Sequence, residues 1–109
     1  MEDGVRFNGH WVDGVPHGEG RKVFPNGNWV AGNFINGYAQ GHGSVFLYDV
    51  GMFEGNLRDN LPHGRGTLTF LDGYRIVGGF SDGFVHGDVR VYTPSGAYEI
   101  MTFVRGVLQ

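Results

Sequence analysis

Histidine, arginine and glycine stand close together in the segment LPHGRGTLTF, residues 61–70. The segment VPHGEGRKVF, residues 15–24, has a histidine and two glycines at the same spacing, followed by two cations. Imidazole nitrogen binds zinc at about 2 Å, and glycine-rich loops bind phosphate through their backbone N–H groups. Metal binding and phosphate binding are therefore the first two functions that these residue types suggest.

Both segments belong to a repeat with a period of 23 residues, which runs through the chain without insertion or deletion. One repeat position holds Trp11, Phe34, Leu57, Phe80 and Phe103, and two further positions hold glycine in all four full units. A fixed period of this length is typical of repeat architectures. We interpret residues 1–109 as one repeat domain with units at about 5–27, 28–50, 51–73 and 74–96 and a partial unit at 97–109.

The histidine position of the repeat argues against a shared metal ion. It holds His17, His63 and His86 in three units, and Gln40 and Gln109 in the others. Neighbouring hairpins of a β array lie about 10 Å apart, twice the strand spacing, which is too far for adjacent histidines to bind one ion. An amide replaces imidazole as a hydrogen-bond partner but is a poor metal ligand. We predict that these histidines are structural turn residues and that there is no metal site.

The other candidate chemistry is weaker still. HGEGRK, residues 17–22, shows neither a following helix nor the full Gly-x-x-x-x-Gly-Lys-Ser/Thr pattern of a phosphate loop. His10, His42 and Ser44 have no orienting carboxylate that the sequence can place beside them. We predict no catalytic residue and no cofactor in this segment. The prediction concerns this segment only, and an enzyme domain attached to it stays an alternative.

Each unit has the pattern of a β-hairpin. Phe7, Gly9 and Trp11 alternate with Asn8 and His10, a period of two that places alternate side chains on opposite faces of a strand. Four pairs have the residue types of hairpin turns with positive φ: Asp13-Gly14, Asn36-Gly37, Asp59-Asn60 and Asp82-Gly83. Glycine recurs every few residues, and each one costs a helix interior about 1 kcal/mol relative to alanine.

The strand glycines have a use in packing. A residue without a side chain lets an aromatic ring lie flat across the backbone, so Gly9 is predicted to be a packing position for a neighbouring ring. Stacked hairpins with about 4.8 Å between strands give an elongated array of about nine strands, roughly 40 Å long. We predict an all-β fold, a single-layer twisted antiparallel sheet of stacked β-hairpins.

The segments FNGHWVDGVPHGEG, FEGNLRDNLPHGRG and IVGGFSDGFVHGDV, at 7–20, 53–66 and 76–89, resemble the MORN repeat. The units of that family combine an aromatic-Glu-Gly opening, an Asp-Gly turn and a His-Gly-x-Gly motif. The resemblance implies a single-layer sheet with a groove, which serves as a protein-interaction scaffold and, by a long-standing proposal, contacts acidic phospholipids. The chain departs from the pattern at Asn8, Ala31 and Val77, which replace the opening glutamate, and at Val89, which replaces a glycine.

Composition excludes several partners and sites. The net charge is −3, and the eight Lys and Arg residues are spread through the repeat rather than clustered. A nucleic-acid-binding surface usually shows a basic stripe, and attraction to acidic lipids grows with clustered cations. We therefore predict no nucleic-acid binding and weak or no phospholipid binding. The chain has no cysteine and no signal-peptide pattern, so we expect a cytoplasmic protein, associated with cytoskeleton or membrane through its partners.

The predicted site is a partner-binding groove made of apolar repeat positions. A single-layer sheet has no second layer to cover its apolar face, so part of that face should stay reachable. The residues assigned to the groove are Phe7, Trp11, Phe34, Phe53, Leu57, Phe70 and Phe80. We predict a non-catalytic scaffold that binds a protein or peptide along this groove.

Three alternatives remain at this stage. The fifth unit supplies one strand, Tyr98 to Val104, and no second strand, so its open edge favours assembly of two copies into a homodimer. The resemblance also implies a targeting or regulatory domain attached to an enzyme, such as a SET-type lysine methyltransferase or a phosphoinositide kinase, or a phospholipid-binding module. MEDG aligns with the turn FPNG at residues 24–27, and we expect the chain to be a fragment of a longer protein.

Overall fold

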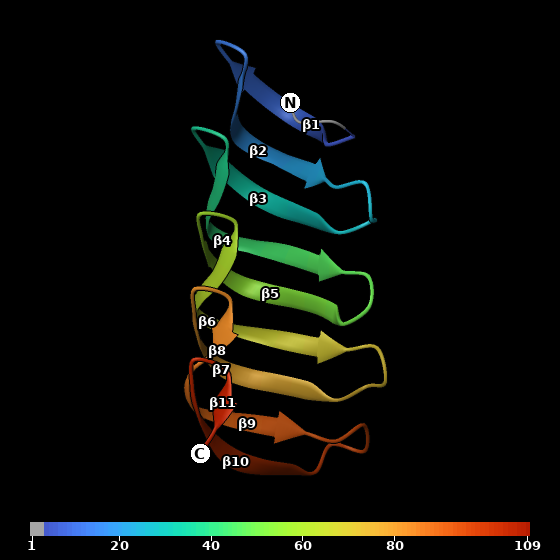
Figure 1. The fold of residues 1–109 in the computed structure, drawn as a ribbon, viewed down its shortest axis with the longest axis vertical. Coiled ribbons are helices and arrows are strands. Elements are labelled where there is room, and N and C mark those ends of the chain that lie inside the picture. Colours follow the sequence, from blue (N-terminus) through green and yellow to red (C-terminus); the bar gives the residue numbers. More distant parts are fainter. Residues whose placement is uncertain (1–3) are drawn as a thin grey trace.

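The computed structural model describes residues 4–109, and these residues form one antiparallel sheet of 11 strands without a helix (Figure 1). The strands are β1 (Arg6–Val12), β2 (Val15–Val23), β3 (Trp29–Ile35), β4 (Tyr38–Leu47), β5 (Gly51–Arg58), β6 (Leu61–Phe70), β7 (Arg75–Ser81), β8 (Phe84–Val85), β9 (Gly87–Tyr92), β10 (Tyr98–Val104) and β11 (Val107–Leu108). The first three residues of the turn expected at MEDG lie outside the described range. Nothing between residues 4 and 109 forms a helix able to cross a membrane.

The strands follow one another across the sheet in chain order, and β8 and β9 both pair with β7 on either side of His86. The array measures 47 × 23 × 20 Å. Only neighbouring strands pair, so the sheet is a single layer, and its strands bend toward the hairpin turns (Figure 1). This confirms the predicted all-β fold of stacked hairpins.

The hairpin turns have the predicted backbone geometry. Asp13 and Gly14 have φ values of 50° and 78°, and Asp59 and Asn60 have values of 51° and 72°. Two successive residues with positive φ define the type I′ turn, whose twist matches that of the flanking strands. Asparagine tolerates this conformation better than other non-glycine residues, and it replaces glycine in the third unit.

The fifth unit differs from its prediction. Arg105 and Gly106 form a fifth turn of the same kind, with φ values of 48° and 87°. The chain then returns as β11, where Leu108 pairs with Phe103. The expectation that β10 has no partner on this side was therefore wrong, because a type I′ turn needs only two residues and Gly106 supplies the position that most favours glycine.

A row of glycines crosses the sheet and marks where the strands curve. Gly9 pairs with Gly20, and Gly55 pairs with Gly43 on one side and Gly66 on the other. The complete glycine row is Gly9, Gly20, Gly32, Gly43, Gly55, Gly66 and Gly78. Shifts in strand register lie beside it in β1, β3 and β5. Such bulges bend a strand, and the sheet becomes a trough between the hairpin turns and the opposite connecting loops (Figure 1).

The inside of the trough holds the core. The ring of Phe7 lies over Gly20, and the ring of Phe53 lies over Gly66, so close that a side chain on either glycine would overlap it. Phe53 also packs edge-to-face on Phe80, with 4.8 Å between ring centroids. The predicted packing role of the strand glycines is confirmed.

The departure from the repeat at Val89 has a packing reason. Val89 stands at the repeat position of Gly20 and Gly66, and its unit has Ile76 at the position that holds Phe7 and Phe53 in the first and third units. The smaller Ile76 leaves room, and Val89 fills it: the side chain is 1% exposed and covers Gly78. The two replacements conserve the apolar volume that a single ring provides elsewhere.

Candidate binding groove

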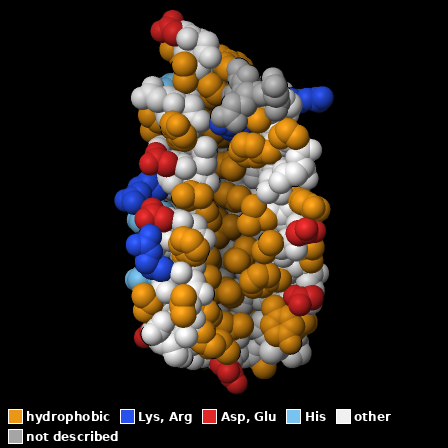
Figure 2. Space-filling view, viewed as in Figure 1, with side chains coloured by type: hydrophobic (Ala, Val, Ile, Leu, Met, Phe, Trp, Pro, Cys, Tyr) orange, Lys and Arg blue, Asp and Glu red, His pale blue; other side chains and the backbone are white. Residues whose placement is uncertain are grey.

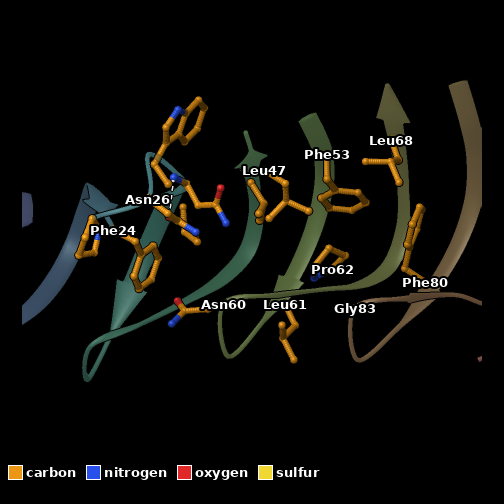
Figure 3. Close-up of a pocket in the computed structure, with 15 residues that line it drawn as sticks. Phe24, Asn26, Leu47, Phe53, Asn60, Leu61, Pro62, Leu68, Phe80 and Gly83 are labelled. Carbon is orange, nitrogen blue, oxygen red and sulfur yellow. Dashed lines mark hydrogen bonds between the residues drawn. The ribbon is translucent and has the colours of Figure 1, made fainter. Parts of the chain in front are cut away.

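A groove of about 610 Å³ lies on the inner face of the trough, over β3 to β7 and the loops at both margins (Figures 2 and 3). We call it the inner groove. Its lining consists of Phe24, Pro25, Asn26, Asn28, Trp29, Val30, Val45, Leu47, Phe53, Asn60, Leu61, Pro62, Leu68, Phe80 and Gly83. None of these residues is charged. In Figure 2 the hydrophobic side chains occupy the hollow centre of this face, and charged side chains gather along its margin.

The groove has more room over the second unit, because smaller side chains replace larger ones there. Val30 occupies the repeat position of Phe7 and Phe53, and Leu47 occupies the position of Phe24. The rings of Phe24 and Phe53 remain on either side (Figure 3). A widening bounded by two rings therefore follows directly from the difference between the units.

The seven residues predicted for the groove fall into three groups in the structure: residues that line it, residues that are buried, and residues that lie outside it. Phe53 and Phe80 line it, although little of either side chain is exposed. Phe34 is 0% exposed, and Phe7 and Leu57 are also buried. The expectation that these three stay reachable was wrong. The rings of Phe7 and Phe34 cover each other edge-to-face, with 4.8 Å between centroids, and Leu57 is packed in the same core cluster.

The other two predicted groove residues lie elsewhere. Trp11 is 46% exposed and contacts the ring of Phe7 edge-on, but it is outside the groove lining. Phe70 is half-buried against the core and is also outside the lining.

Prediction from sequence missed two kinds of groove residue. Leu47 and Leu68 share a face with the predicted rings, and their place in the second strand of each unit was the signal for them. Asn26, Asn28 and Asn60 lie in connecting segments, where asparagine is so common that no pattern points to a site.

The side chain of each of the three groove asparagines accepts a hydrogen bond from a backbone N–H group. Asn26 Oδ1 accepts a hydrogen bond from the backbone N–H of Asn28 at 3.0 Å. Asn28 Oδ1 accepts from the N–H of Tyr48 at 2.8 Å, and Asn60 Oδ1 accepts from the N–H of Ala39 at 2.6 Å. Since a backbone N–H can only donate, these contacts fix which side-chain atom is the oxygen.

The repeated histidines have a structural role. His63 Nδ1 accepts a hydrogen bond from the N–H of Asp82 at 3.1 Å, and His86 Nδ1 accepts one from Arg105 at 3.1 Å. Gln40 Oε1 accepts the equivalent bond from Asp59 at 3.2 Å. In each case the side chain binds the first turn residue of the next hairpin. The prediction of a turn role, with glutamine as a substitute, is confirmed for these positions.

The remaining sequence candidates are not brought together. HGEGRK runs along β2 rather than forming a loop before a helix. His42 and Ser44 lie on β4, and within residues 4–109 no hydrogen bond joins their side chains to His10 or to a carboxylate. Over the same range, no three His, Asp or Glu side chains are grouped as metal ligands.

The charged side chains lie outside the inner groove. Arg58 Nη2 is 3.0 Å from Asp82 Oδ1 at the hairpin-turn margin, and both side chains are largely exposed. Arg21 lies 4.2 Å from the ring centroid of Trp29. The hydrogen bond that Arg90 donates to Tyr92 raises the pKa of that guanidinium, which stays charged.

Comparison with known families agrees with this geometry. The profile of the MORN repeat matches residues 7–29, 31–45 and 53–73, which together are more than half of the chain. The chain belongs to the MORN-repeat family. MORN repeats form a repeat module rather than a catalytic fold and are known in protein-interaction and membrane-targeting modules. No curated protein matches the chain.

The MORN assignment explains the hairpin-turn margin and the floor of the groove. The Asp-Gly turns and the histidines of the repeat build the hairpin-turn margin, as seen for Asp82 and His63. The glycine row and the aromatic positions build the floor. What the family pattern leaves variable is the size of the floor residues, and in this MORN chain that variation places the widening of the groove over the second unit.

Proposed function

We propose that this MORN array is a non-catalytic interaction module whose inner groove binds an apolar segment of a partner protein. The observation that carries the proposal is the groove itself, a volume of about 610 Å³ lined by 15 residues without a formal charge. Binding sites in proteins commonly have volumes of about 300–1,000 Å³ and mostly apolar walls with a few polar groups. The inner groove has that composition.

The single-layer fold supports this use. The opposite face of the sheet does not pack on a second layer within residues 4–109, and neither does the groove face. Apolar side chains such as Leu61, which is 45% exposed, therefore remain in contact with water. Burying them under a partner gains about 25 cal/mol for each Å² of apolar surface removed from water. The floor is held by the sheet, so little ordering is needed on binding.

The test uses peptides selected from a random 12-residue phage-display library on the immobilised chain. A fluorescent consensus peptide is then titrated against variants by anisotropy. Leu68→Lys places a charge in the groove, and the fold accommodates it because Lys22 has the same repeat position in the first unit. We expect binding to weaken at least about tenfold, since a buried unpaired charge is costly.

Thr69→Lys is the matched control. Thr69 is the next residue along β6, is exposed and points to the other face of the sheet. This variant should bind the peptide as the parent chain does. A library without binders, or equal binding by the Leu68→Lys variant, would overturn the proposed function.

A further inference from the structure

Three amide groups at the inner groove have an unused donor side. The Oδ1 atoms of Asn26, Asn28 and Asn60 are each bound to a backbone N–H. Within residues 4–109 no acceptor is bound to any of the three Nδ2 groups. Each amide nitrogen carries two N–H donors. The groove therefore offers hydrogen-bond donors in an otherwise apolar lining.

The donors stand on both margins of the groove. Asn26 and Asn28 lie in and next to the loop between β2 and β3, and Asn60 lies in the turn between β5 and β6. In Figure 3 Asn26 is labelled above Asn60, and both lie beside Phe24. A bound segment that lies between the margins thus passes amide donors on either side.

The lining selects a chemical class of partner. No charged residue belongs to it, and the cations Arg21 and Lys22 lie against two of the lining rings, 4.2 Å from the centroid of Trp29 and 5.7 Å from that of Phe24. The lining combines neutral donors with apolar walls, and the complement is a neutral segment with apolar side chains and free hydrogen-bond acceptors. The backbone of an extended peptide has this composition, because each of its carbonyl groups is an unpaired acceptor.

A helix matches the donors less well. The carbonyl groups inside an α-helix are already bound by N–H groups four residues along the chain, and only the last turn has free ones. An extended segment presents carbonyl groups along its whole length. Unpaired amide donors beneath a bound helix would lose their water without a replacement, which costs binding energy.

We propose that the inner groove binds an uncharged apolar peptide segment in extended conformation, with its backbone carbonyl groups accepting hydrogen bonds from Asn26, Asn28 and Asn60. One bulky apolar side chain of the segment fills the widening over Val30, Val45 and Leu47, between the rings of Phe24 and Phe53. This inference rests on the proposed function and names the conformation and chemistry of the partner segment.

The test uses variants that keep the accepting oxygen of an amide and replace its N–H donors by a charged carboxylate oxygen. Asn28→Asp and Asn60→Asp keep an oxygen to accept from Tyr48 and Ala39, and aspartate tolerates the φ of 72° at position 60 as asparagine does. Each replaces an N–H donor by a carboxylate oxygen facing a carbonyl group. We expect binding of the consensus peptide to weaken at least about fivefold in each variant.

Two further variants complete the design. Asn33→Asp adds the same charge at an exposed position on the other face of the sheet and should bind normally. Leu47→Phe restores the ring found at this repeat position in Phe24 and Phe70, fills the widening, and should also weaken binding at least about fivefold. Thermal melts confirm that each variant is folded.

Carbon-13 chemical shifts of the bound, isotope-labelled peptide report its conformation. Extended shifts together with weaker binding by both Asn→Asp variants support the inference. Helical shifts overturn it, and so do groove Asn→Asp variants that bind the peptide as well as the Asn33→Asp control does. A groove filled by a second copy of the chain, detected by concentration-dependent light scattering, also overturns it. If the Leu68→Lys variant loses binding while the Asn→Asp variants do not, the proposed function stands and this inference fails.

Discussion

Phe53 and Gly66 illustrate how the size of one residue is set by its neighbour on the next strand. The ring lies directly over the glycine, and a Cβ there would overlap it. In the fourth unit the same space is filled by a smaller side chain, Ile76, and a larger one, Val89, at the positions of Phe53 and Gly66. The repeat therefore conserves a packed volume rather than a particular residue, since protein interiors are filled to a nearly constant density.

Gly66→Val is expected to destabilise the fold by about 1–3 kcal/mol, the usual cost of overpacking. Adding Phe53→Ile should recover at least about 1 kcal/mol, because the pair then matches Ile76 and Val89. Gly55→Val is also expected to be destabilising, but Phe53→Ile should recover less of its cost. A Cβ on Gly55 would lie 2.5 Å from the backbone oxygen of Arg65, which cannot be made smaller.

Urea denaturation of the single and double variants gives the coupling free energies directly. Strictly additive effects of Gly66→Val and Phe53→Ile would contradict the shared-volume argument. A harmless Gly55→Val would remove the packing role assigned to the glycine row.

Hairpins are joined to one another by a recurring pair of hydrogen bonds. His63 accepts from the N–H of Asp82, and the carbonyl group of Pro62 accepts from the N–H of Gly83 at 2.8 Å. The same arrangement joins Gln40 and Ala39 to the Asp59-Asn60 turn. At this scale the side chain and the backbone act together to set each hairpin on the one before it.

His63→Ala is expected to cost about 1 kcal/mol, because the N–H of Asp82 loses its acceptor while remaining partly open to water. His63→Gln should cost clearly less, since Gln40 makes the equivalent bond. Thermal melts of the two variants measure the difference. Equal destabilisation by alanine and glutamine would show that the imidazole acts through packing instead, and a cost above that of Gly55→Val would reverse the order expected here.

The molecule as a whole is a long, thin array whose charged residues lie outside the lining of the inner groove. It is 47 Å long and 23 Å or less in the other directions, and its net charge is −3. Several arginines stack on aromatic rings, as Arg75 does 4.5 Å from the ring centroid of Tyr92. The cations are thus dispersed over separate places instead of forming one basic surface.

We expect weak binding to vesicles that contain phosphatidylserine at about 0.15 M salt, because attraction to an acidic surface grows with clustered cations and is screened beyond roughly 8 Å. Vesicle sedimentation measures it, with neutral phosphatidylcholine vesicles as the control. Strong sedimentation that survives this salt concentration would instead favour a membrane-targeting role for the array.

The period of the sequence alone determined the class of fold, the order of the strands in the four full units and the turns of those units. Glycine and asparagine tolerate positive φ and rings need glycine beneath them, so Asp13-Gly14 and Gly9 were sufficient local signals. Only the tertiary structure decided which apolar residues remain open. Phe34 and Val30 are both buried positions of the same inner face, but the first is covered by neighbouring rings and the second forms the floor of a groove. That difference depends on the sizes of side chains from adjacent units, which meet only when the hairpins stack.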